Sequence, residues 1–367
     1  MTTGITIGID ARKARDFGIG TYTRELIAAL GALPEASRSR FLLFVRPGDE
    51  ELFSSLPRNF GLVAENAPGY SLRELFGFGS RVRRARLDLF HALHYVLPAA
   101  GAVPCVVTVH DAIHLEFPDG GASPLRYPYA RIMIRRALRR SGAVITPSLS
   151  VRRDLEEISP ASAAKMDAIP HGAPAKFRPD VPEGEVERVR RRYALPDGYA
   201  LYLGGAKPHK NLTRVVDAFR AARTGGLSLV LAGPLPPASS AEIANEGIRR
   251  AGLVAEEDLP ALYRGASFLL YPTLAEGFCF PLLEAMASGV PAIASDIPAC
   301  REVAAGAARL VDPRDTPAIT RAVEALSGDA ALRADLSARG LARARDFSWK
   351  RTAERTWSVY RRVLEGR

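Results

Sequence analysis

Two acidic residues, Glu276 and Glu284, stand in a stretch whose pattern predicts a strand, a loop and a helix start. The apolar run that ends at Tyr271 is typical of a strand, and Pro281 occupies the position at which many helices begin. A helix start favours a bound anion by roughly 0.5 to 2 kcal/mol, and carboxylates bind hydroxyl groups. The stretch predicts a site for a ligand with a diphosphate and hydroxyls. Acids that only stabilise a helix start are the ordinary alternative.

Other residues with possible chemistry follow predicted strands elsewhere. Gly18 and Gly20 follow the first strand, and glycines let the backbone approach a phosphate closely. His110 ends the run CVVTVH, and Lys207 and Lys210 follow the run ALYLG. Lysines neutralise phosphate without a fixed geometry. Each also has an ordinary interpretation, as a plain turn, a structural histidine or exposed loop lysines.

These residues need a scaffold that brings strand ends together, and the chain alternates short apolar runs with longer helical patterns. This alternation predicts an α/β fold with parallel sheets. The expected strands are 5–9, 41–45, 88–91, 105–109 and 143–146 in the first half, and 200–204, 228–233, 268–272 and 291–295 in the second. A Pro- and Gly-rich break separates the halves. We expect two Rossmann-like domains, residues 1–172 and 173–347, and a final helix in 348–367 that packs back on the first domain.

Composition narrows the classes of function. The chain has 367 residues, a formal net charge of +10 and 47% hydrophobic residues, which is typical of a folded protein of two domains. Its three cysteines are far apart, which argues against a disulfide framework or a zinc site. No Asp-x-Asp pair occurs, so we expect no metal. The start resembles no secretory signal and no uninterrupted apolar span is present, so we expect a cytoplasmic protein.

The positive charge is concentrated in the first half. Arginines cluster within residues 81–86, 131–140 and 152–153, with few balancing acids in these clusters. Solvated helix faces explain many such clusters. The alternative is peripheral association with an anionic membrane at its inner face.

The segment EGFCFPLLEAMASGVPAIASD, which contains both acids, closely resembles the signature of the retaining glycosyltransferases of family 4, which have the GT-B architecture of two Rossmann-like domains facing a central cleft. The resemblance implies that Glu276 contacts the donor sugar and Glu284 the nucleoside ribose. It places His110 near the donor sugar and Lys210 at the diphosphate. Gly205 stands where many members have an arginine, and Lys207 is the expected substitute.

The resemblance also implies a set of site residues, a first domain that binds the acceptor and a second that binds the donor. Catalytic roles are expected for His110 and Glu276; donor binding for Gly18, Gly20, Gly205, Lys207, Lys210, Gly277, Phe278, Cys279, Phe280 and Glu284; and acceptor binding for Tyr22, Asp111 and Ser148. Cys279 and Phe280 replace the glycine and leucine usual in the family, and His171 replaces an asparagine, which changes the expected pocket shape.

The activity implied is transfer of a sugar from a nucleotide diphosphate sugar to a saccharide or lipid-linked acceptor, in bacterial cell-surface polysaccharide or glycolipid synthesis. The opening GIDAR and the segment KPHKNL look more like mannosyl- and rhamnosyltransferases, which favours GDP-mannose as donor. No cofactor beyond this donor, no metal and no nucleic acid are expected.

Three other interpretations stay open. A nucleotide-sugar epimerase of the same fold would bind the same donor without an acceptor. A basic membrane- or nucleic-acid-binding protein with a vestigial site would explain the arginines, although aromatic residues are not interleaved with them. A dehydrogenase fits less well, because the first loop lacks the full G-x-G-x-x-G.

Overall fold

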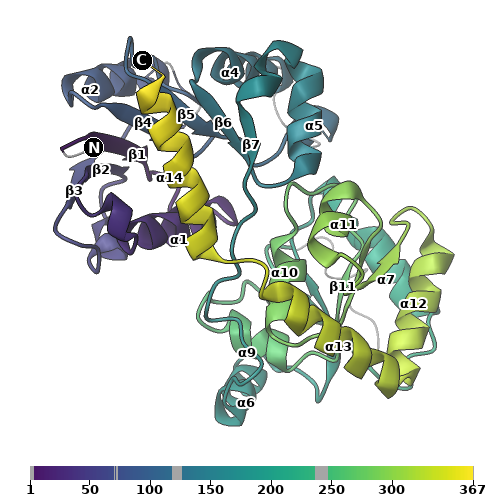
Figure 1. Ribbon diagram of the computed structural model, residues 1–367. Helices are drawn as coiled ribbons and strands as arrows, with labels where there is room; N and C mark the ends of the chain where they lie inside the picture. Colours follow the sequence, from purple (N-terminus) through teal and green to yellow (C-terminus); the bar gives the residue numbers. More distant parts are fainter. Residues whose placement is uncertain (1–3, 70, 72, 118–125, 236–246, 367) are drawn as a thin grey trace. The chain divides into compact units, whose positions relative to one another are not determined.

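The computed structural model describes residues 4–69, 71, 73–117, 126–235 and 247–366 (Figure 1). The chain forms two compact units, one of Met1–Gly172 with Ser348–Arg367 and the other of Ala173–Phe347. Each unit is a parallel β-sheet with helices packed around it, which confirms the predicted α/β class.

The first unit contains a seven-stranded parallel sheet in the order β3-β2-β1-β4-β5-β6-β7. Its strands are β1 Thr6–Asp10, β2 Arg40–Val45, β3 Phe60–Ala64, β4 Leu89–Ala92, β5 Cys105–Thr108, β6 Ala143–Thr146 and β7 Met166–Ala168. β1 pairs with β2 and β4, and Ile7 of β1 lies opposite Phe41 of β2 and Leu89 of β4. β4, β5 and β6 are buried along their whole length, as expected of strands covered on both faces.

The helices of the first unit connect these strands. They are α1 Ile19–Gly31, α2 Gly79–Arg84, α3 Ile113–Glu116, α4 Arg126–Arg140, α5 Leu149–Ile158 and α14 Trp349–Glu365, with 3-10 turns η1 Pro34–Ala36, η2 Glu50–Phe53 and η4 Pro160–Lys165 and a π-helical turn η3 Arg73–Phe78. α14 comes from the end of the chain and packs along α1. Ser348 caps α14, where its side chain accepts a hydrogen bond from the Arg351 N–H.

The second unit contains a six-stranded parallel sheet in the order β10-β9-β8-β11-β12-β13. Its strands are β8 Tyr199–Leu203, β9 Ser228–Ala232, β10 Ile248–Gly252, β11 Phe268–Tyr271, β12 Ala292–Ser295 and β13 Arg309–Val311. Its helices are α6 Glu183–Arg192, η5 Pro208–Lys210, α7 Leu212–Ala221, α9 Leu259–Arg264, α10 Phe280–Ala287, α11 Pro298–Ala304, α12 Thr316–Gly328 and α13 Ala330–Ala344. β8 and β11 lie at the centre of this sheet, so the loops that follow them meet at its carboxyl edge.

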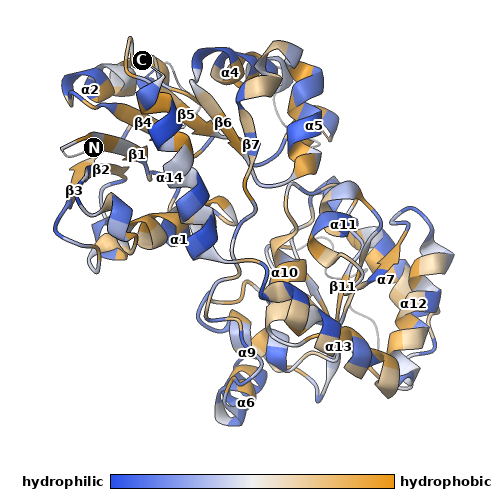
Figure 2. Cartoon of the chain, viewed as in Figure 1, coloured by the Kyte–Doolittle hydropathy of each residue, from blue (hydrophilic) through white to orange (hydrophobic). Residues whose placement is uncertain are grey.

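Apolar side chains fill both faces of each sheet. In the second unit one cluster joins Leu201, Leu269 and Leu283, and another joins Ala200, Leu270 and Val215. Figure 2 shows that the strands are largely apolar, whereas the helices carry hydrophilic residues on parts of their surfaces. Because both faces are closely packed, each sheet is rigid and fixes the positions at which the loops of its carboxyl edge begin.

The structure contains four strands that the sequence pattern did not predict: β3, β7, β10 and β13. Each lies at an edge of its sheet. An edge strand has only one neighbour and is covered less completely, so it needs no continuous apolar run. β10 carries Arg249 and Arg250 for this reason.

Candidate active site

The loops after β8 and β11 are tied together at the carboxyl edge of the second sheet. The Leu274 N–H and the Thr273 hydroxyl donate to the backbone oxygen of His209 at 2.7 and 2.8 Å. The Asn211 side-chain amide donates to the backbone oxygen of Pro272 at 2.7 Å. Residues from the two loops are thereby held in a fixed arrangement before any ligand binds.

Three side chains form a hydrogen-bonded cluster at this edge. The Lys210 ammonium donates to Glu276 Oε1 at 2.6 Å and to the Tyr271 hydroxyl at 2.9 Å, and that hydroxyl lies 2.5 Å from the same Glu276 oxygen. The Lys210 and Glu276 side chains are 21% and 12% exposed, so a ligand can reach both. Among the described residues, no donor bonds to Glu276 Oε2. The structure thus brings together two predicted residues and one, Tyr271, that sequence reasoning missed.

The helix that follows Glu276 begins as predicted. Cys279 has a left-handed backbone with φ 68°, and Pro281 lies in the first turn of α10. The Cys279 thiol is buried 2.6 Å from the sulfur of Cys300, and burial raises its pKa well above the ordinary value. The protonated thiol points into the core, so a contact of Cys279 with the donor would be made by its backbone, and that contact stays a prediction.

Phe278 is also a core residue. Its side chain is buried and its ring packs at 5.3 Å from the ring of Phe280 and at 5.9 Å from that of Phe347. Because the ring is packed in the core, a contact of Phe278 with the donor would be made by its backbone, and that contact stays a prediction. Phe280 itself is half-buried. Gly277 precedes these residues in the same loop and contributes only backbone.

Glu284 lies one turn into α10 and is almost buried. The Tyr263 hydroxyl donates to its Oε2 at 2.8 Å. Burial raises the pKa of the Glu284 carboxyl to about 7, and the Tyr263 hydrogen bond only partly offsets this effect. Among the described residues no donor bonds to Oε1, so this oxygen can accept a hydroxyl from a ligand.

The loop after β8 approaches the loop after β9 closely. Gly233 has φ 127°, and a Cβ at this position would lie 2.2 Å from the Gly204 backbone oxygen. The Tyr202 hydroxyl lies within hydrogen-bonding distance of the backbone oxygens of Gly205 and Lys210, at 3.0 and 3.2 Å. Lys207 is exposed on the same loop. The Lys207 side chain is therefore available to a phosphate, whereas Gly205 has no side chain that could bind one.

His110 lies at the carboxyl edge of the first sheet, two residues after the end of β5. Its Nε2 is 3.0 Å from the Leu93 backbone oxygen, and because a carbonyl only accepts, Nε2 carries the hydrogen. Burial lowers the pKa of His110 to about 4. The ring is therefore neutral at pH 7, and Nδ1 is a hydrogen-bond acceptor suited to a sugar hydroxyl.

Two residues expected to bind the acceptor are buried. Tyr22 is fully buried and its hydroxyl lies 3.0 Å from Thr108 Oγ1, while its ring packs edge-on against His110 at 4.8 Å. Ser148 is buried and its hydroxyl caps α5 by accepting from the Val151 N–H at 3.1 Å. Both side chains are engaged in packing or capping within the first unit, and their contact with an acceptor stays a prediction.

The remaining predictions of the first unit concern short loops. Asp111 is half-buried and accepts from the Ile113 N–H at 3.1 Å. Gly18 has φ 69° at the start of α1, and a Cβ at Gly20 would lie 2.5 Å from the Ala14 backbone oxygen. Both glycines are required by the turn itself, which is the ordinary interpretation of this motif. Their contact with a ligand stays a prediction.

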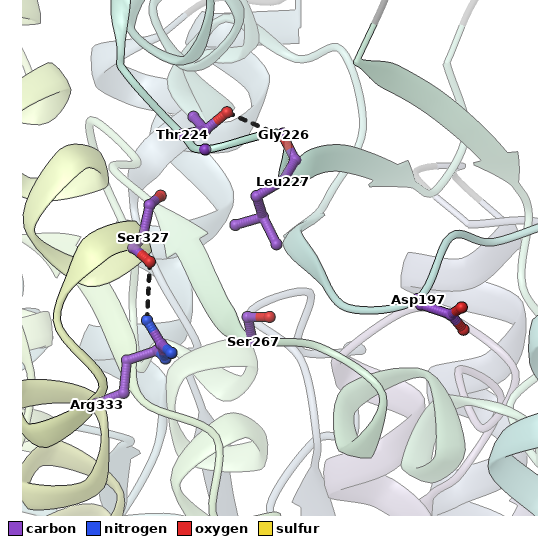
Figure 3. Close-up of a pocket in the computed structure, with 8 residues that line it drawn as sticks. Asp197, Thr224, Gly226, Leu227, Ser267, Ser327 and Arg333 are labelled. Atoms are coloured by element: carbon purple, nitrogen blue, oxygen red, sulfur yellow. Dashed lines mark hydrogen bonds between the residues drawn. The ribbon is translucent and has the colours of Figure 1, made fainter.

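A cavity of about 310 Å³ lies at the other end of the second sheet (Figure 3). It is lined by Asp197 and Ser267, which precede β8 and β11, and by the loop 224–227 before β9. The Arg333 guanidinium donates to the Ser327 backbone oxygen at 3.0 Å on its wall. This cavity opens at the amino ends of the strands, whereas the Lys210 cluster lies at their carboxyl ends.

In the portion of the chain that the structure describes, no group of three or more His, Cys, Asp or Glu side chains is arranged to hold a metal ion. A search of the same residues finds no helix that is both long and apolar enough to span a membrane.

Comparison with known proteins identifies the class. Residues 18–177 match the family described as "Glycosyltransferase Family 4", and residues 198–329 match "Glycosyl transferases group 1". The chain belongs to this family of glycosyltransferases.

The relatives and solved structures agree with this assignment. O-antigen chain mannosyltransferase B of Escherichia coli is 28% identical over 284 residues, which are 74% of each chain. The serotype-specific mannosyltransferase WbdA of Escherichia coli is 27% identical over 239 residues, and the match spans 62% of this chain but only 29% of WbdA. The Anabaena protein HepE, solved with UDP and glucose, superimposes with a TM-score of 0.75 at 17% identity over 97% of this chain and 99% of HepE. The fold is therefore the GT-B fold.

Proposed function

We propose that this protein is a retaining mannosyltransferase that transfers mannose from GDP-mannose to a saccharide or lipid-linked acceptor in bacterial cell-surface polysaccharide or glycolipid synthesis, without a metal. The names of the relatives, two of which are mannosyltransferases, support the choice of sugar. The observation that carries the proposal is the cluster of Lys210 and Glu276 beside the start of α10.

The donor is proposed to lie along this edge of the second unit. Glu276 Oε2 accepts a hydroxyl of the sugar, and the open oxygen of Glu284 accepts a ribose hydroxyl. Lys210, Lys207 and the positive end of α10 neutralise the diphosphate. His110 is proposed to be a catalytic residue on the strength of the family resemblance.

Catalysis is proposed to come from stabilising the leaving group. The bond between the anomeric carbon and the phosphate oxygen breaks while the acceptor oxygen bonds to that carbon on the same face. The acceptor proton passes to the departing phosphate oxygen. Negative charge that develops on the diphosphate is met by ammonium groups and a helix dipole already in place, and such preorganised charges supply a large part of enzymatic rate enhancement. No protein nucleophile is assigned.

The first test is nucleotide binding. Calorimetry with GDP, UDP, ADP, dTDP and their sugar conjugates, in the presence of chelator, identifies the donor. We expect GDP-mannose to bind, and Lys210→Ala to weaken it by about 100-fold, since the loss of a charged hydrogen bond to phosphate costs roughly 1.5 to 3 kcal/mol. Lys350→Ala, an exposed lysine of α14, is the control. Failure of every nucleotide to bind would contradict the proposal, and formation of an altered sugar nucleotide in place of a glycoside would indicate an epimerase.

We further propose that α4 carries the protein to the inner face of an anionic membrane. Arg131, Arg135 and Arg139 recur along its exposed face, and no described carboxylate forms an ion pair with them. Ile132, on the same helix, is 59% exposed. Arginines beside an exposed apolar side chain suit a surface of anionic headgroups, where a lipid-linked acceptor would be found.

A further inference from the structure

We propose that Tyr271 is a positioning residue for the transfer reaction, holding the Glu276 carboxylate and the Lys210 ammonium in one arrangement so that each keeps one group free for the donor. The inference rests on the proposed function and extends it to a residue that neither the motif nor the family match singles out.

The place of Tyr271 in the fold makes it the rigid member of the cluster. It is the last residue of β11, an interior strand of the second sheet, and its side chain is 1% exposed. Lys210 is the last residue of the 3-10 turn η5, and Glu276 stands on the loop between β11 and α10. A buried tyrosine at the end of an interior strand has little freedom to move, so its hydroxyl is a fixed reference point for these two side chains.

The hydrogen-bond directions in the cluster follow from the chemistry of the three groups. Lys210 can only donate and a carboxylate can only accept. The Tyr271 hydroxyl therefore accepts from Lys210 at 2.9 Å and donates to Glu276 Oε1 at 2.5 Å. Burial and the neighbouring Glu276 charge raise the pKa of Tyr271 well above its ordinary value, so the hydroxyl keeps its proton. The Thr273 hydroxyl, 3.2 Å from the same oxygen, lies closer to the His209 backbone oxygen, at 2.8 Å.

This arrangement leaves one hydrogen-bonding group of Glu276 and one of Lys210 available to the nucleotide-sugar donor. Glu276 Oε1 receives both Lys210 and Tyr271, which turns Oε2 towards no described donor. Lys210 has three N–H groups and uses two of them on Glu276 and Tyr271, so the third remains for a phosphate oxygen. A nucleotide sugar can therefore bind without breaking the ion pair between Lys210 and Glu276.

Tyr271→Phe tests the inference because it removes only the hydroxyl. Glu276 then loses one donor and Lys210 one acceptor, and both side chains gain freedom. We expect kcat to fall about 10- to 100-fold, the range for a small misplacement of catalytic groups, with KM for GDP-mannose changed far less. We also expect the affinity ratio of GDP-mannose to GDP to fall, because the sugar contact is disturbed more than the nucleotide contact. This ratio is measured by calorimetry and needs no acceptor.

The matched control is Tyr199→Phe. Tyr199 is also a buried strand tyrosine of the second sheet, but its hydroxyl donates to the Leu262 backbone oxygen at 2.6 Å, away from Lys210 and Glu276. Tyr271→Phe loses two hydrogen bonds of the buried hydroxyl and Tyr199→Phe loses one, so both variants should melt at a lower temperature. Only Tyr271→Phe should change the affinity ratio and kcat.

A double-mutant cycle with Glu276→Gln separates positioning from a general structural effect. If Tyr271 acts through Glu276, adding Tyr271→Phe to Glu276→Gln should reduce kcat by much less than it does in the wild-type protein. Full additivity, or a Tyr271→Phe variant that behaves like Tyr199→Phe, would overturn this inference and leave the proposed function standing. A wild-type protein that binds no nucleotide sugar would overturn the proposed function, and this inference with it.

Discussion

At the scale of single residues, the chemistry of the site depends on which atom of each side chain is already occupied. Glu276 and Glu284 were predicted from their spacing, and the structure shows that each has one oxygen bonded within the protein and, among the described residues, one without a donor. Their partners Tyr271 and Tyr263 could not be predicted. The sequence pattern around a tyrosine in an apolar strand or helix is the same whether its hydroxyl contacts solvent, a backbone oxygen or a carboxylate.

Burial also divides the predicted site residues into those with exposed side chains and those with buried ones. Tyr22, Ser148, Phe278 and Cys279 lie in stretches that match the family, yet their side chains point into the core. A motif preserves the path of the backbone, and side chains within it are selected for packing as well as for binding. Neighbours distant in sequence, such as Cys300 beside Cys279, determine which of the two applies.

We predict that Glu284 makes donor binding sensitive to pH. Its pKa is raised to about 7, so near pH 6 most of the carboxyl is protonated and near pH 8 most is ionised. A ribose hydroxyl donates better to the ionised form, so binding lowers the pKa and releases a proton. Affinity for GDP should therefore rise with pH through about 7, by up to tenfold per pH unit below the pKa. Calorimetry at pH 6 and 8 measures this change.

The control for this pH dependence is Glu284→Gln, which cannot ionise. The remaining dependence in that variant belongs to the phosphate groups of GDP and is subtracted. Equal pH dependence in the wild type and in Glu284→Gln would show that Glu284 does not titrate in this range or does not contact the nucleotide.

At the scale of elements, the interior strands could be predicted and the edge strands could not. Every strand expected from an apolar run, such as β5 and β11, is covered by neighbours on both sides, and the four missed strands are the four sheet edges. β3 and β10 include exposed residues, and β7 and β13 have three residues each. Their positions depend on pairing with a neighbour, which local patterning does not encode.

The close approach of two loops at the carboxyl edge depends on Gly233. In Gly233→Ala the new Cβ would overlap the Gly204 backbone oxygen at 2.2 Å, and φ 127° is strained for alanine. We expect the free energy of unfolding to fall by about 2 to 4 kcal/mol and GDP binding to weaken, because the loop that carries Lys207 and Lys210 must move.

Gly225→Ala is the matched control for Gly233→Ala. Gly225 also has a positive φ, 62°, but a Cβ there meets nothing within 4 Å. Its cost should be about 1 kcal/mol, from backbone strain alone, with GDP affinity unchanged. Urea unfolding measures both. Similar losses in the two variants would show that the contact with Gly204 relaxes easily.

At the scale of the whole molecule, the net charge of +10 comes from arginines that differ in whether they form ion pairs. Many arginines of the second unit are paired, as Arg188 and Arg192 are with the buried Asp258. The exposed arginines of α4 have no described carboxylate partner. The sequence of α4 itself contains several arginines and no acidic residue, so this helix carries a local excess of positive charge.

This concentration predicts salt-sensitive binding to anionic vesicles. The protein should co-sediment with vesicles of phosphatidylglycerol and phosphatidylcholine but not with phosphatidylcholine alone, and binding should weaken as salt is raised. Replacing Arg131 and Arg135 with glutamate should weaken it about 10-fold or more, since each basic residue near such a surface contributes about 1 kcal/mol. Arg188→Glu is not a suitable control because it would break a buried pair, whereas Arg220→Glu changes an exposed arginine of α7. Equal loss in both would contradict a role for α4.

The return of the chain into its first unit has a consequence for how the protein is made. Residues 348–367 complete the first unit, where the Tyr360 hydroxyl lies 2.6 Å from His91 Nδ1 in the core. The second unit, Ala173–Phe347, is one unbroken piece of chain, but the first unit is not. On the ribosome, the segment that ends at Gly172 emerges early and cannot bury its α14 face until the whole second unit has been synthesised. The unit that begins first is therefore the one that finishes last.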